Sequence, residues 1–219
     1  TTDYLTNFIE STAETALILD PQTGIRFLHY SIVPSTLSFD YYAPKNQHFC
    51  NIQANVTLRT GEQMIFQNTR SFPIYIADDQ VDRIRANGIA IEDSFPVSPG
   101  KYKLSILLMN SVGKEFCVTE KEVEVPFDPA EPKLGGPYLG YKTESYSRDV
   151  HIPFKIGETK IVVDPKKIFS VADYLTVLFS IENLTEELRT GGEVRMNIIR
   201  MRTEKPEEHL STIKLTNLA

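Results

Sequence analysis

The sequence has no tryptophan, only two cysteines and only four histidines among its 219 residues. Without tryptophan, the chain lacks the largest aromatic face that a sugar-binding surface uses for stacking. The histidines are too scattered to give the ligand spacing of a zinc site, so we predict no metal site. No apolar run approaches the roughly 20 residues of a membrane-spanning helix, so we predict no membrane insertion.

The chain also lacks any excess of basic residues. Its formal net charge is −6, from 23 Lys and Arg against 29 Asp and Glu. Phosphate binding needs clustered positive charge, so nucleic acid is not an expected partner. The hydrophobic content of 41% is that of a globular protein, and the length is sufficient for one large domain or two small ones.

A turn followed at once by an alternating strand is the most informative feature of the sequence. Pro99 and Gly100 favour a chain reversal. From Tyr102 onward, apolar side chains alternate with polar ones as far as residue 108, which predicts a half-buried strand. A tyrosine at the head of such a strand is typical of the tyrosine corner of immunoglobulin-like β-sandwiches. We therefore predict that Tyr102 caps the preceding loop.

Similar alternation and turn signals recur along the chain and predict an all-β protein. In the first half the expected strands are 16–19, 25–33, 37–43, 48–59, 72–76, 100–109 and 114–125, with one more through Met64 and Phe66 after the Thr60-Gly61 turn. Pro73 suits an edge strand, because proline cannot donate to a ladder. In the second half the expected strands are 151–156, 158–163, 174–182, 193–202 and 209–217.

The domain boundary is expected at residues 127–137, which contain three prolines and two glycines. We predict two tandem immunoglobulin-like β-sandwich domains, 1–126 and 138–219, with a short N-terminal helix (3–12) or extension. The second domain shows about five strands against the roughly seven of a complete sandwich. Either the chain is a fragment of a longer protein or a strand arrives from another chain.

Two local features leave alternatives open. Asp78-Asp79 can begin a short helix that ends at Asn87-Gly88, or Asn87-Gly88 can be a hairpin turn. Cys50 and Cys117 both have the parity of inward-facing strand residues. They form either a disulfide between two strands or two buried free thiols, since connectivity cannot be read from sequence.

The search for chemistry gives no catalytic, cofactor-binding or metal-binding residue. Asp149 and His151 could be combined with a serine into a triad, but the sequence has no Gly-x-Ser-x-Gly elbow to position a nucleophile. Tyr138, Tyr141 and Tyr146 cluster after the expected linker. They either pack at the junction between the domains or form a contact surface.

Several short motifs resemble the immunoglobulin-like modules of bacterial GWxTD-domain proteins and of their relatives that carry von Willebrand A-like domains. The matching segments are 37–42, 98–104 and 123–126, and in the second half 136–141, 152–154 and 169–175. The naming motif of the family requires a tryptophan, so the domain that defines the family is absent. The resemblance implies a secreted or envelope-associated bacterial β-protein. It carries no functional residue onto this chain.

These observations together predict a non-enzymatic structural or protein-interaction module of a bacterial extracytoplasmic or surface assembly. Exposed β edges are the natural means by which such a module pairs with another copy or with another envelope protein. The partner is therefore expected to be protein, with a homo-oligomer or a larger assembly as the result. The alternative is a small-ligand or glycan-binding accessory module, which requires a concave aromatic and polar surface. No cofactor is expected in either case.

Overall fold

The computed structural model of the chain describes residues 7–127, 131–203 and 206–216. The predicted all-β class is confirmed, since the described elements are mostly strands in antiparallel sheets. The strands are β1 Ser11–Leu19, β2 Arg26–Pro34, β3 Asp40–Tyr42, β4 Gln47–Thr60, β5 Gln63–Ala77, β6 Ile91–Pro96, β7 Gly100–Asn110, β8 Phe116–Val125, β9 Lys133–Ser145, β10 Lys155–Ile156, β11 Thr159–Val163, β12 Thr176–Glu182, β13 Glu193–Arg200 and β14 Glu208–Thr216.

Helical structure is sparse in the described residues. Two α-helices, α1 Val81–Asn87 and α2 Glu186–Gly191, accompany two 3₁₀ turns, Ala43–Lys45 and Asp78–Gln80. No helix in this part of the chain has the length and apolar character needed to cross a membrane. Of the two alternatives at Asn87-Gly88, the structure has the helix, and the Gly88 amide donates to the Ile84 carbonyl at its end.

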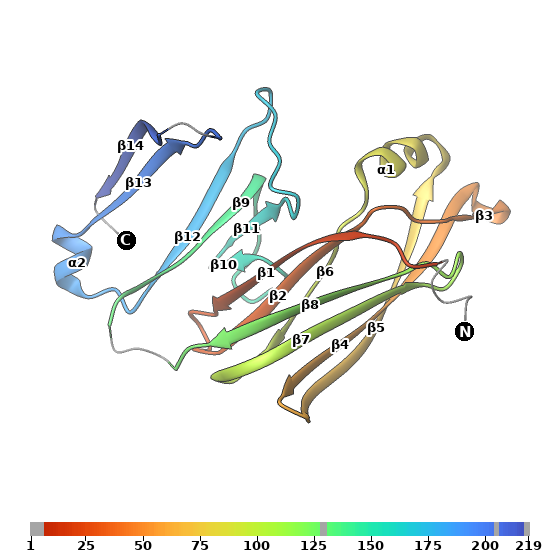
Figure 1. Cartoon of the computed structure of the whole chain (residues 1–219), viewed down its shortest axis with the longest axis horizontal. Helices are drawn as coiled ribbons and strands as arrows, with labels where there is room; N and C mark the ends of the chain where they lie inside the picture. Colours follow the sequence, from red (N-terminus) through yellow and green to blue (C-terminus); the bar gives the residue numbers. More distant parts are fainter. Residues whose placement is uncertain (1–6, 128–130, 204–205, 217–219) are drawn as a thin grey trace. The chain divides into compact units, whose positions relative to one another are not determined.

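Two sheets pack face to face in the first part of the chain (Figure 1). One sheet has the strand order β1-β2-β6. The other has the order β3-β4-β7-β8, with β5 paired to the free side of β4. All of the strand pairings within these two sheets are antiparallel. The result is a sandwich-like architecture.

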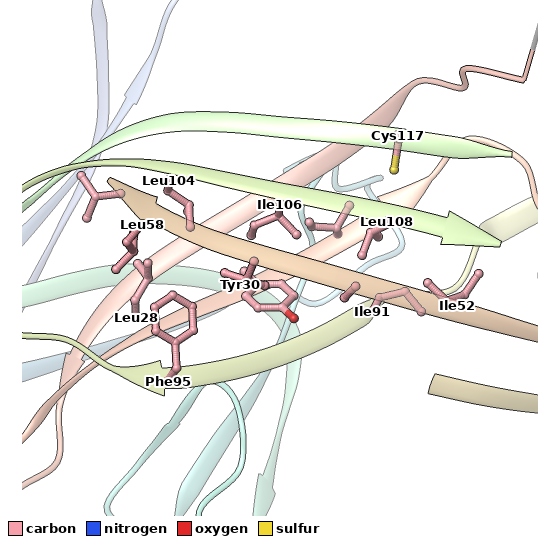
Figure 2. Packing of buried hydrophobic residues seen from close by; sticks show 14 of the residues in the cluster. Leu28, Tyr30, Ile52, Leu58, Ile91, Phe95, Leu104, Ile106, Leu108 and Cys117 are labelled. Atoms are coloured by element: carbon pink, nitrogen blue, oxygen red, sulfur yellow. The ribbon is translucent and has the colours of Figure 1, made fainter. Parts of the chain in front are cut away.

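The alternating residues of the central strands form the main core between the two sheets. Leu104, Ile106 and Leu108 of β7 are almost completely buried, as their parity predicts. They face Leu28 and Tyr30 of β2 across the interior (Figure 2). Burying an aliphatic side chain of this size stabilises the folded state by about 1.5–3 kcal/mol. This core therefore fixes which face of each strand points outward.

A second apolar cluster joins β1 to the segment that follows the expected linker. Ala16 and Ile18 of β1 are buried together with Tyr138, Phe154 and Ile161. Tyr138 and Ile161 belong to a sheet with the strand order β10-β11-β9-β12. Phe154 belongs to the loop between β9 and β10 of that sheet. The segment thus covers the outer side of the β1-β2-β6 sheet.

The contacts divide the chain differently from the domain boundaries predicted from the sequence. One compact unit contains residues 1–128 and 136–179, and the other contains 129–135 and 180–219. Part of the expected linker is strand, because β9 already begins at Lys133. Its two glycines, Gly135 and Gly136, serve close packing, since a Cβ atom on Gly136 would lie 3.0 Å from the Leu178 carbonyl oxygen of β12. The glycine content that suggested a linker therefore belongs to a strand.

The predicted N-terminal helix over residues 3–12 is wrong for the part that the structure describes. Phe8 forms a β-bridge with Phe116, and β1 begins at Ser11. The Ile9 amide donates to the Phe116 carbonyl, and the two phenyl rings lie 5.6 Å apart. Pairing with β8 therefore outweighs the helical spacing of the apolar residues. The earlier part of the predicted helix, 3–6, lies outside the described residues.

Candidate functional site

The outer edge of β5 is the most prominent candidate surface on the molecule (Figure 1). At 15 residues it is the longest of the described strands, and it pairs with β4 alone among them. Such an edge presents a row of backbone N–H and C=O groups to solvent. The sequence prediction that Pro73 marks an edge strand is confirmed.

β5 has a proline, Pro73, and a bulge at Ile65, but it has little charge for an edge strand. Natural edges are usually guarded by charged side chains, prolines or bulges. Arg70 is the sole charged residue in β5, and it forms a 2.6 Å ion pair with Asp93 of β6. The opposite edge strand, β8, has four charged residues among its ten, namely Glu120, Lys121, Glu122 and Glu124. β8 is therefore protected by charge, whereas β5 has one charged residue along its whole length.

Each edge strand of the smaller sheet contacts the segment that covers this sheet. On β6, Glu92 forms a 2.9 Å ion pair with Lys160. On β1, the Leu17 carbonyl accepts a 3.0 Å hydrogen bond from the hydroxyl of Tyr138. Both partners belong to the segment that covers this sheet. By comparison, β5 is the sandwich edge that is most open to a new strand.

Exposed aromatic and apolar side chains lie along β5 and beside it. Met64, Ile65 and Tyr75 are 42%, 50% and 53% exposed. The ring of Tyr75 lies 5.1 Å from that of Phe49 on β4, and the Lys45 ammonium lies 5.8 Å from the Tyr75 ring centre. These side chains offer amphipathic contact area at both ends of β5, Met64 and Ile65 at its start and Tyr75 near its end.

Tyr102 occupies the position expected of a tyrosine corner. It lies near the start of β7, and its hydroxyl donates to the carbonyls of Ser98 and Pro99 at 3.0 and 3.2 Å. The phenol thus holds the turn between β6 and β7, as the sequence pattern predicts. Its role in the fold is structural.

Cys50 and Cys117 are both buried free thiols. They lie on β4 and β8, which are separated by β7. Neighbouring strands are about 4.8 Å apart, so these two strands are roughly 9.6 Å apart, beyond the ~7 Å that a disulfide can span. Burial raises the pKa of the Cys50 thiol to about 12 and also raises that of Cys117. Neither thiol is therefore activated as a nucleophile.

The three tyrosines after the expected linker do not act as one cluster. Tyr138 is buried against β1, where its hydroxyl bonds the Leu17 carbonyl. The Tyr141 hydroxyl donates to Asp164 at 3.0 Å, and this side chain is 40% exposed. Tyr146 is also partly exposed, and it donates to Glu144. Tyr138 is thus a packing residue, whereas Tyr141 and Tyr146 remain accessible.

The structure places His151 beside Ser94, a pair that the sequence did not single out. The Oγ atom of Ser94 and the Nε2 atom of His151 are 2.8 Å apart. That distance suits a nucleophile and a base. However, Ser94 lies within β6 rather than at a strand-to-helix turn, and Asp149 accepts a hydrogen bond from Ser147. The arrangement therefore differs from the triad considered from the sequence.

His29 of β2 is a buried polar residue near the same histidine. It is 2% exposed, and its Nδ1 atom accepts a 3.0 Å hydrogen bond from the Phe154 amide. Burial, with a smaller contribution from the nearby His151, lowers the pKa of His29 to about 3. The ring is therefore neutral at physiological pH. Sequence reasoning missed it because its environment is formed by a segment more than 100 residues away.

No family model matches the sequence, and no curated protein matches it either. The functional interpretation therefore depends on the geometry of this chain and on the short motifs described above.

Proposed function

We propose that the protein is a non-enzymatic structural module that associates with further copies of itself by pairing along β5. The observation that supports this most directly is the combination of length and near absence of charge on this edge. Strand addition to an edge supplies main-chain hydrogen bonds, and the side chains supply specificity. In a second copy, β5 is itself a strand of matching length, so antiparallel pairing about its centre forms a closed two-fold interface.

The resemblance to modules of bacterial envelope proteins supports an extracytoplasmic or surface assembly as the setting. On this proposal the sandwich of β1–β8 is an immunoglobulin-like domain, with Tyr102 as its tyrosine corner. The strands from β9 onward are, on this proposal, a second, incomplete sandwich. An incomplete sandwich has unpaired edges, which suits a module whose neighbours complete its sheets.

The test is the mass of the purified chain, measured by size-exclusion chromatography with light scattering over a wide concentration range. The wild type should form a dimer or a larger defined oligomer as its concentration rises. The variant Gln67→Lys/Thr69→Lys/Ser71→Lys should need roughly 30-fold higher concentrations to associate. These three positions are exposed and lie on one face of β5.

The reason is that symmetric pairing brings six lysines together. Unfavourable like-charge contacts across strands cost up to ~1 kcal/mol each, so a total of about 2 kcal/mol, or roughly a 30-fold weaker dimer, is expected. The matched control Gln67→Asn/Thr69→Ser/Ser71→Thr keeps these positions neutral and should associate like the wild type. A wild type that stays monomeric throughout overturns the proposal, and so does a lysine variant that associates normally.

A further inference from the structure

A cavity of about 520 Å³ lies beside the β1-β2-β6 sheet, within the first unit of the chain. It is lined by the turn between β1 and β2, by residues of those two strands and by the segment 148–157, which includes β10. This volume lies within the ~300–1,000 Å³ that small-molecule sites occupy. The surface is therefore hollowed on a scale that admits a ligand, at a place separate from the β5 edge.

One buried polar group is available to a ligand in this cavity. His29 lines the cavity and uses Nδ1 to accept the hydrogen bond from the Phe154 amide. A neutral imidazole with this acceptor carries its proton on Nε2. The hydrogen bonds of the described residues include none from this N–H. Because His29 lines the cavity, this N–H can donate to an acceptor atom on a ligand there.

An apolar and aromatic wall stands beside this donor. The rings of Phe27 and His151 have their centres 4.2 Å apart, and the hydrogen bond between Ser94 Oγ and His151 Nε2 holds the second ring. Ile18 and Val150 add aliphatic surface to the lining. The wall can therefore receive the apolar face of a small ring.

The charged residues of the lining cancel one another. Asp20 and Asp149 are balanced by Arg148 and Lys155. Each of them is already held locally. Asp20 accepts from the Gln22 amide at 3.0 Å, and Arg148 pairs with Glu158 at 2.8 Å. Lys155 donates to the carbonyls of residues 148 and 150. Within the described residues, no three potential ligands are grouped to hold a metal ion. The cavity thus favours an uncharged ligand.

We propose that this cavity binds an uncharged, polyhydroxylated ring, such as a single hexose unit of a glycan. The C–H face of a hexose is apolar and fits the Phe27–His151 wall. Its hydroxyl groups both donate and accept, so they can use the His29 N–H and the spare lone pairs of the carboxylates at the rim. Charged ligands such as phosphates or amino acids gain no net attraction from this lining.

The test is saturation-transfer NMR of the whole chain with glucose, galactose, mannose and N-acetylglucosamine as separate probes, and with inorganic phosphate and glycine for comparison. The variant Val150→Trp fills the cavity from an exposed position in its lining. The matched control Val171→Trp places the same side chain at a fully exposed position outside the lining. Near-UV circular dichroism verifies that both variants are folded.

At least one of the sugars should give a saturation-transfer signal with the wild type and with Val171→Trp. Its dissociation constant should rise about tenfold or more in Val150→Trp, since the new indole occupies the space of the ring. The proposal is overturned if no sugar binds, if phosphate or glycine binds in place of sugars, or if Val150→Trp leaves sugar binding unchanged. Because the β5 edge plays no part in these measurements, their outcome is independent of self-association.

Discussion

The buried, neutral His29 should make the stability of the protein depend on pH in a defined direction. Its pKa is about 3 in the folded protein, against 6.5 for an unperturbed histidine. Between these values the unfolded chain binds a proton that the folded chain does not. The contribution of His29 to the free energy of unfolding is thus fully retained above pH 6.5, and it is lost progressively as the pH falls toward 3.

The magnitude follows from the two pKa values. A pH of about 5 lies about 1.5 units below the pKa of histidine in the unfolded chain. Proton binding therefore stabilises the unfolded state and lowers the free energy of unfolding by about 2 kcal/mol relative to pH 7.5. The folded protein does not compensate by binding a proton at pH 5. The ring is buried there, and its Nδ1 atom accepts the Phe154 amide hydrogen bond. Protonation of Nδ1 would break that hydrogen bond.

Urea unfolding at about pH 7.5 and about pH 5, followed by far-UV circular dichroism, measures the effect. The variant His29→Gln keeps an acceptor for the Phe154 amide but cannot be protonated, so it should lose about 2 kcal/mol less than the wild type between the two pH values. His209→Gln removes an exposed histidine of β14 and should behave as the wild type does. Equal pH dependence in the wild type and in His29→Gln would refute the reasoning.

Two further predictions concern the sandwich core. Tyr30→Phe should raise the free energy of unfolding by about 1 kcal/mol, because the Tyr30 hydroxyl is buried without a hydrogen-bond partner among the described residues. Urea unfolding at neutral pH measures this change, and a destabilised variant would contradict the prediction. Cys50 and Cys117 should be unreactive toward a thiol reagent in the native protein and should both react after unfolding in urea without reductant, since they are buried free thiols with raised pKa values. Failure of two thiols to appear in the unfolded chain would indicate a disulfide.

Most strands could be predicted from the sequence because their signal is local. The alternation of Leu104, Ile106 and Leu108 fixes both the strand and its buried face, and the structure agrees with it. The same holds for Pro73, since a missing N–H limits a strand to an edge wherever it lies. β9 was missed because its glycines and Pro137 resemble a linker, and the need for those glycines arises from a strand that follows later in the chain.

The sequence by itself determined the all-β class, the parity of the core strands and the lack of basic surface. All three depend on composition or on neighbours two residues apart. Only the tertiary structure decided which edge stays open, that Cys50 and Cys117 lie too far apart to be joined, and that His29 lies beside His151 at a cavity. These features depend on which strands become neighbours, and strand order is set by the packing of the whole sandwich rather than by any local pattern.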